Sequence, residues 1–146
     1  MLGGALALTA LAAWWQRRRG GAVRGADDAR GRTTAAVLEG LGVRPGEADL
    51  TVVQFSTAFC GPCRATRARL QQLRATRPGL AHVDVDAESH LDAVRELDVR
   101  RTPTLFYLDR TGTLLGRSSG APRPDELTAL VEAHVRPAGA RDGRDV

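Results

Sequence analysis

The sequence predicts an α/β fold in which a mixed central sheet carries helices on both faces and is preceded by an N-terminal hydrophobic helix. Three observations predict it. Between residues 50 and 135, apolar runs of strand length alternate with amphipathic runs of helix length, as in parallel strands joined by helices. Two strand-like runs near the end of this region follow each other directly, as in a hairpin. The first 15 residues contain no charged side chain.

The composition indicates one domain plus extensions within the 146 residues. A hydrophobic content of 42% is sufficient for a core, and an aromatic content of 4% indicates that this core consists mainly of Leu, Val and Ala. The net charge is +4, but the sequence shows no broad basic face with interleaved aromatic residues. It therefore gives no indication of nucleic-acid binding.

Residues 1–19 are predicted to form a membrane anchor. The uncharged run is short for a span, but Trp14 and Trp15 suit the membrane interface, and the arginines at 17–19 can reach the headgroups. Because positive residues stay on the cytoplasmic side, we expect a single-pass anchor in the cell membrane, with the rest of the chain in the cytoplasm. One alternative is a secretory signal sequence or an outward-facing anchor, although a signal sequence normally carries its positive charge before the apolar core. Another is a short buried or interfacial helix.

Residues 20–48 are predicted to be a linker, because they are rich in Gly, Arg and Asp. Within them, a weak apolar stripe indicates a short helix over residues 33–41, followed by a turn at Pro45-Gly46. The domain that follows is expected to cover residues 49–136, and residues 137–146 are expected to be a disordered tail.

The first half of this domain is predicted to be a strand, a helix and a second strand. Residues 50–55 are a continuous apolar run, typical of a strand that is covered on both faces. A helix from about residue 63 to residue 77 ends at Pro78-Gly79, and a second strand covers residues 80–86. One face of the helix points inward and carries Cys63, Thr66, Leu70 and Leu73.

The second half is predicted to be a helix over residues 87–97, two strands over 104–108 and 113–116, and a last helix from about 124 to 135. The inward residues of the first helix are expected to be Leu91, Val94 and Leu97. The core face of the last helix is expected to contain Leu127, Leu130, Val131 and Val135. The acidic residues Asp84, Asp86 and Glu88 lack the spacing of a calcium loop, so we interpret them as a strand end and a helix N-cap, and predict no metal site.

Cys60 and Cys63 are the only cysteines in the sequence, and they lie where the first predicted strand gives way to a helix. Unpaired N–H groups and the helix dipole stabilise an anionic sulfur at this position, which makes Cys60 a reactive thiol. Two other interpretations are open. A zinc site needs about four ligands, and the three histidines show no paired spacing. A purely structural bridge would close a very short loop and remove little unfolded-state entropy. We favour a redox-active dithiol.

Over about residues 50–135, the chain resembles the thioredoxin family. The residues that carry the resemblance are Cys60-Gly61-Pro62-Cys63, which is similar to the family's active-site sequence, and residues 99–104, which are similar to its cis-proline loop. Gly112 and Gly120 fall where the family has glycines. The resemblance implies the thioredoxin fold. With its apolar N-terminus, the chain resembles small membrane-tethered members of the family from bacteria.

The resemblance also implies an activity. Cys60 would attack a partner disulfide, and Cys63 would resolve the resulting mixed disulfide. Pro103, in cis, would bring the backbone of Thr102 beside the sulfurs to bind an extended substrate. The remaining active-site loop residues that contact substrate would be Phe59, Gly61 and Pro62. No cofactor is implied, and the implied partners are protein disulfide or dithiol substrates and a redox donor.

Several positions differ from the family pattern. Phe59 replaces the usual Trp, Gln54 the usual buried Asp, and His82 the usual Lys, while Thr102 replaces the usual Ile before the proline. Two of these positions, Gln54 and His82, are candidates for tuning the redox properties. A third candidate is Arg64, because its charge can add to the stabilisation of the thiolate. We expect a thiol–disulfide oxidoreductase that reduces protein disulfides. The alternatives are an outward-facing oxidant or reductant of extracytoplasmic proteins, and a non-catalytic adaptor with the same fold.

Overall fold

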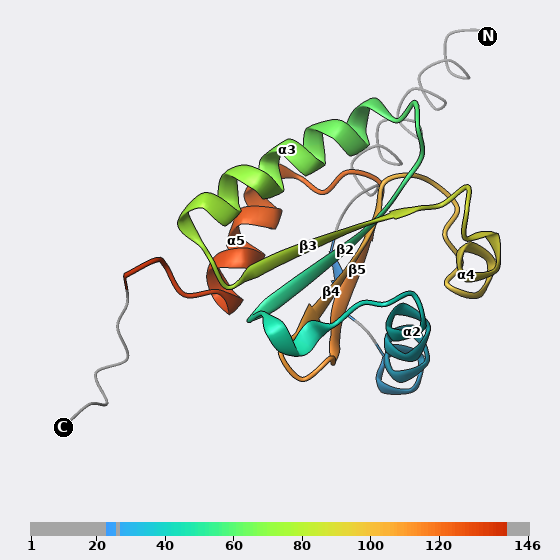
Figure 1. Cartoon of the computed structure of the whole chain (residues 1–146), viewed down its shortest axis with the longest axis horizontal. Coiled ribbons are helices and arrows are strands. Elements are labelled where there is room, and N and C mark those ends of the chain that lie inside the picture. The colour runs from blue at the N-terminus through green and yellow to red at the C-terminus, as the bar shows by residue number, and fades with distance from the viewer. Residues whose placement is uncertain (1–22, 26, 140–146) are drawn as a thin grey trace, which may run out of the picture.

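The computed structural model describes residues 23–25 and 27–139, which form a twisted sheet with helices on both sides (Figure 1). The sheet has the strand order β1-β5-β4-β2-β3. The predicted membrane anchor, residues 1–19, lies outside the described residues. Within the described part of the chain, no helix is long and apolar enough to cross a membrane.

The central strand β2 (Leu50–Ser56) is buried along its whole length, as the apolar run predicts. It is parallel to β3 (Leu80–Asp86) and antiparallel to β4 (Thr104–Asp109). β4 forms an antiparallel hairpin with β5 (Leu114–Ser119). The prediction of a mixed sheet is therefore confirmed, with β3 as predicted and β5 extending three residues beyond its predicted end.

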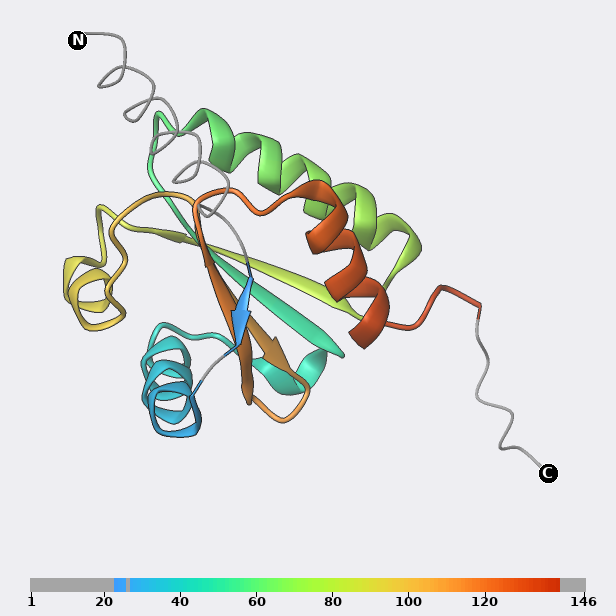
Figure 2. The same ribbon diagram turned by 180° about the vertical axis from the view of Figure 1, so that it is seen from behind.

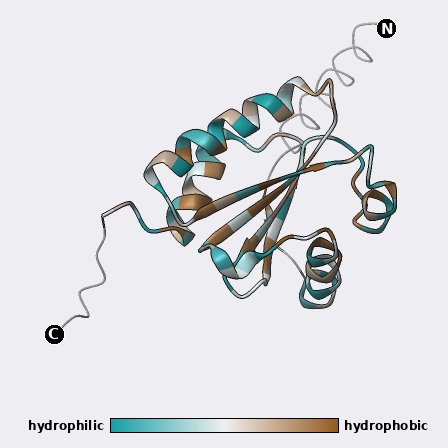
Figure 3. Ribbon diagram, viewed as in Figure 1, coloured by the Kyte–Doolittle hydropathy of each residue, from teal (hydrophilic) through white to brown (hydrophobic). Residues whose placement is uncertain are grey.

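In the described part of the chain, helices cover both faces of the sheet (Figures 1 and 2). One face carries α3 (Gly61–Thr76) and α5 (Pro124–His134), and the other carries α2 (Asp28–Gly40) and the short α4 (Leu91–Glu96). Hydrophobic residues line the strands, whereas the helices have mixed faces (Figure 3). The core on the α3 and α5 side contains Leu50, Val52, Leu70, Leu73, Leu80, Leu105, Tyr107, Leu127, Val131 and Val135.

Residues 24–48, which were predicted as part of a linker, differ from that expectation. β1 (Arg24–Gly25) pairs with β5, α2 starts five residues earlier than the predicted helix, and a 3-10 turn follows at Pro45–Glu47. The second core, between the sheet and α2 and α4, includes Leu38 and Val43, which are 0% and 1% exposed. Because few other residues of α2 are buried, the apolar stripe in its sequence is weak.

The helix predicted over residues 87–97 is shorter than expected. Residues 86–90 instead form a turn in which the Asp86 carboxylate accepts hydrogen bonds from Ser89 Oγ and Glu88 N. Leu91 consequently lies in the first turn of α4 and is 52% exposed, so the prediction that it faces inward is wrong. Leu97 is buried as predicted, Val94 is partly buried, and Ala93 is buried in place of Leu91.

Candidate functional site

Cys60 and Cys63 form a disulfide at the N-terminus of α3. β2 ends at Ser56, a loop of three residues follows, and Cys60 is the N-cap of the helix. Its sulfur accepts a hydrogen bond from Cys63 N at 3.1 Å. One of the free N–H groups of the first helical turn therefore points at this sulfur, as the position predicts.

The two sulfurs are not equally accessible. Cys63 is 1% exposed and lies on the inner face of α3 with Thr66, Leu70 and Leu73, whereas Cys60 is 8% exposed. The residues next to them reach the surface, since Gly61 and Pro62 are exposed and Phe59 is 98% exposed. A partner molecule therefore reaches Cys60 more readily than Cys63.

A hollow of about 390 Å³ lies beside the disulfide. Both basic and acidic side chains line it, and Arg67 forms an ion pair with Asp84. Hydrogen bonds from Ser89 and from Glu88 N lower the pKa of Asp86. The lining residues are Ser56, Thr57, Ala58, Cys60, Cys63, Arg64, Arg67, Asp84, Asp86 and Glu88.

Glu88 joins this hollow to the segment that leads to Cys60. Its carboxylate accepts a hydrogen bond from Ala58 N at 3.4 Å, and Ala87 N donates to Ser56 O at 2.9 Å. The loop after β3 therefore supports the loop after β2. Sequence reasoning placed Glu88 at a helix N-cap and missed this contact, because 30 residues separate Glu88 from Ala58 and no local pattern connects them.

Gln54 contacts the backbone of Cys63 and is completely buried. Side chains alternate along a strand, so Gln54 shares the α3-facing side of β2 with Leu50 and Val52. Its Nε2 donates hydrogen bonds to Cys63 O at 3.0 Å and to Ser56 Oγ at 2.9 Å. The structure thus brings this predicted tuning residue into direct contact with the second cysteine.

His82 lies on the same side of the sheet, but it is not among the residues that line the hollow. Burial lowers its pKa; Asp84 acts in the opposite direction, and Arg67 and Arg74 lower it further. Its Nε2 is buried without a hydrogen-bond partner among the described residues. These observations fit a core histidine better than a proton relay.

The Thr102–Pro103 peptide bond is cis, in agreement with the resemblance. Pro103 is buried, its carbonyl accepts a hydrogen bond from Gly120 N at 2.7 Å, and Thr102 Oγ1 lies 3.3 Å from Thr57 Oγ1. The proline loop is therefore tied to the segment just before Cys60. Neither Thr102 nor Pro103 lines the hollow beside the disulfide.

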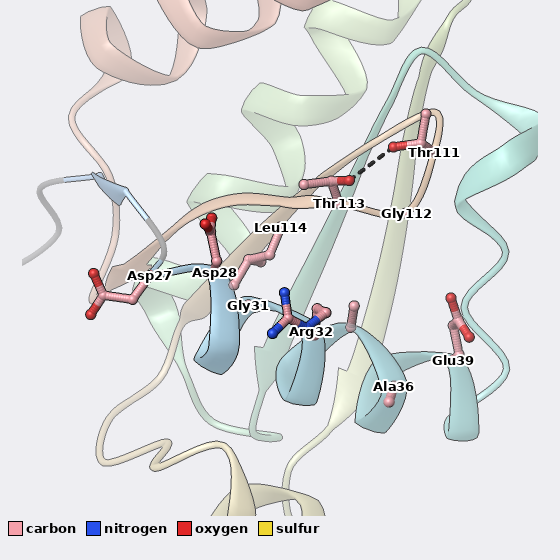
Figure 4. A pocket seen from close by; sticks show the side chains of 11 residues that line it. Asp27, Asp28, Gly31, Arg32, Ala36, Glu39, Thr111, Gly112, Thr113 and Leu114 are labelled. Carbon is pink, nitrogen blue, oxygen red and sulfur yellow. Dashed lines mark hydrogen bonds between the residues drawn. The ribbon is translucent and has the colours of Figure 1, made fainter.

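A second hollow, of about 460 Å³, lies between α2 and the turn joining β4 to β5 (Figure 4). Asp27, Asp28 and Glu39 contribute carboxylates to its wall and Arg32 a guanidinium, and Thr111 and Thr113 share a hydrogen bond across the turn. It contains no cysteine. In the described part of the chain, no group of three His, Cys, Asp or Glu residues could hold a metal ion.

Known proteins resemble this chain over the region just described. The family model described as Thioredoxin matches residues 43–133. Thioredoxin H4-1 of Oryza sativa is 29% identical over 87 residues, which cover 58% of this chain and 66% of that protein. Thioredoxin of Pongo abelii is 31% identical over 86 residues, covering 59% and 80%. The chain spans 47% to 66% of the length of several curated relatives from rice and a fungus.

Solved structures show the same similarity. The X-ray structure of Fasciola hepatica thioredoxin matches with a TM-score of 0.56 and 29% identity, covering 70% of this chain and 95% of that one. Oxidised mitochondrial thioredoxin 3 from Saccharomyces cerevisiae matches with a TM-score of 0.55 and 26% identity, covering 66% and 89%.

Proposed function

The chain belongs to the thioredoxin family, and on that premise we propose that it is a thiol–disulfide oxidoreductase that reduces protein disulfides through Cys60 and Cys63. The observation that carries the proposal is the disulfide at the start of α3, in which one sulfur caps the helix and the other is buried behind it. A structural bridge needs neither the helix terminus nor this difference in exposure.

Cys60 is the attacking thiolate. It is the more exposed of the two cysteines, and the helix dipole together with the Cys63 N–H stabilises its negative charge. The thiolate attacks one sulfur of a partner disulfide, forms a mixed disulfide, and releases the other partner sulfur as a thiolate, which takes up a proton.

Cys63 then resolves the mixed disulfide. Its sulfur loses a proton and attacks Cys60 Sγ, which breaks the bond to the partner and restores the Cys60–Cys63 disulfide seen in the structure. The partner leaves as a dithiol that has gained two electrons and two protons. A separate dithiol donor must reduce the Cys60–Cys63 disulfide before the next cycle.

The exposed residues around the disulfide form the proposed substrate surface. Phe59 supplies an apolar side chain, Gly61 and Pro62 complete the turn, and the Thr102–Pro103 loop offers backbone groups to an extended segment of the partner. Arg64 is exposed and lines the same hollow as Cys60, so its positive charge favours the nearby thiolate.

Reduction of a model protein disulfide by wild-type and Cys60→Ser protein tests the proposal. We expect the variant to lose the activity, and a wild-type rate in Cys60→Ser would refute the mechanism. The reduction potential then gives the direction of transfer: a value near about −270 mV indicates a reductant, and one near −120 mV an oxidant.

We also propose that an N-terminal anchor holds this domain at the cytoplasmic face of the cell membrane. The support comes from the uncharged run at residues 1–15 and the arginines at 17–19. A topology reporter fused after Val146 tests the orientation. Reporter activity on the cytoplasmic side is expected, and activity only on the outer side would contradict the proposal.

A further inference from the structure

We propose that Gln54 is a positioning residue whose side-chain oxygen accepts a hydrogen bond from the Cys63 thiol once the disulfide has been reduced. In the disulfide form this oxygen has no hydrogen-bond donor among the described residues, although it is buried. The inference rests on the proposed function, because it requires the cysteines to alternate between disulfide and dithiol.

The orientation of the Gln54 amide follows from its neighbours. The Cys63 carbonyl oxygen can only accept a hydrogen bond, so the amide group 3.0 Å from it must be the NH₂. The same NH₂ also donates to Ser56 Oγ. The Oε1 atom, on the other side of the amide, therefore contacts neither the Cys63 carbonyl nor Ser56 Oγ. It is also shielded from solvent, because the Gln54 side chain is 0% exposed.

An unpaired amide oxygen at such a depth is unfavourable, because folding has removed its hydrogen bonds to water. Reduction of the disulfide by a partner dithiol supplies a donor. The S–S bond breaks, the partner's two sulfurs form a disulfide, and the two partner protons are transferred to the cysteines or, for a thiolate at Cys60, partly to solvent. Cys63 is 1% exposed, so its new S–H group has no ready access to water.

The Gln54 amide already contacts the Cys63 backbone through its NH₂ group, and Oε1 of the same amide is the buried acceptor, without a donor among the described residues, that we assign to this new S–H group. A thiol is a weak donor, but the alternative is an unpaired S–H beside an unpaired buried oxygen. The hydrogen bond exists only in the dithiol form, whereas the bond from Nε2 to Cys63 O is available in both forms. Gln54 therefore stabilises the dithiol and makes the couple more oxidising.

Equilibration with dithiothreitol measures this effect. Gln54→Leu replaces the amide with an apolar side chain of similar size, and we expect the equilibrium to move about tenfold toward the disulfide, which corresponds to a potential about 30 mV more negative. Ser56→Ala is the matched control. It removes the other partner of Nε2 and leaves Oε1 in place, so we expect a change of less than about twofold. A shift below twofold in Gln54→Leu, or a shift toward the dithiol, would overturn the inference.

An infrared measurement tests the same hydrogen bond with Gln54 intact. In Cys60→Ser the only thiol belongs to Cys63, and we expect its S–H stretch at the lower frequency of a hydrogen-bonded thiol. The frequency should rise to that of a free thiol when Gln54→Leu is added. A free-thiol frequency in Cys60→Ser alone refutes the inference, even if the Leu variant does not fold. Failure of the proposed function would be separate, since it would appear as disulfide-reducing activity that survives in Cys60→Ser.

Discussion

Replacing Leu38 by alanine tests whether α2 is an integral part of the folded domain. Leu38 is 0% exposed and belongs to the core between α2, α4 and the sheet, where Val43, Phe106 and Leu108 are also buried. Burial of a leucine side chain contributes roughly 1.5–3 kcal/mol, and the cavity left by its removal adds to the loss. We therefore expect Leu38→Ala to lower the free energy of unfolding by about 3 kcal/mol, and Tm by roughly 10–20 °C.

Denaturant titration of the oxidised protein measures this loss, with Leu91→Ala as the matched control. The two variants delete the same atoms, but Leu91 is 52% exposed, so its replacement should cost less than about 1 kcal/mol. A smaller slope with denaturant in Leu38→Ala would show that α2 detaches before the rest unfolds. Equal effects of the two substitutions would refute the account, because they are the result expected if residues 20–48 are a linker.

Two further predictions concern titration and charge. Burial holds the pKa of His82 below its usual value, so the folded protein favours the neutral imidazole. The neutral imidazole contributes fully to stability above a pH of about 6.5, and this contribution is lost as the pH falls below that value. The free energy of unfolding should therefore fall less between pH 7 and pH 5 in His82→Gln than in the wild type; parallel curves would contradict this. Arg64→Glu should slow alkylation of Cys60 at pH 7 about two- to fivefold, because it removes an exposed charge that favours the thiolate. Arg74→Glu, which changes an exposed arginine further along α3, is the control, and equal slowing in both variants would rule out a local effect of Arg64.

The elements that could be predicted from the sequence are those with long, regular patterns. β2 and β3 are runs of seven residues. Near the end of the chain, the α5 residues Leu127 and Val131 and the C-cap residue Val135 lie at helical spacing on one buried face. β1 and α2 carry much weaker patterns. A strand of two residues has no measurable alternation, and the buried residues of α2 are only Gly31 and Leu38. Tertiary packing around Leu38, rather than periodicity, makes this segment part of the fold.

Some residues of the candidate site could likewise be predicted from local patterns in the sequence, and others could not. Cys60 and Cys63 could be predicted because their spacing and their position between a strand and a helix are local properties of the sequence. The contacts that shape their surroundings are not local. Glu88 reaches Ala58 across 30 residues, and Thr102 lies beside Thr57 across 45. The position of Gln54 on an inward face could be predicted from β2, but its contact with the Cys63 carbonyl depends on how α3 packs on the sheet.

Mass spectrometry of the trapped intermediate tests the central claim most directly. Cys63→Ser keeps the accessible Cys60 and removes the sulfur that resolves the mixed disulfide. After incubation with a disulfide-bonded peptide, we expect this variant to carry the peptide on Cys60, while Cys60→Ser carries none and the wild type turns over without retaining it. Absence of an adduct in Cys63→Ser, or faster adduct formation on Cys63 in Cys60→Ser, would contradict the assignment of Cys60 as the attacking thiolate.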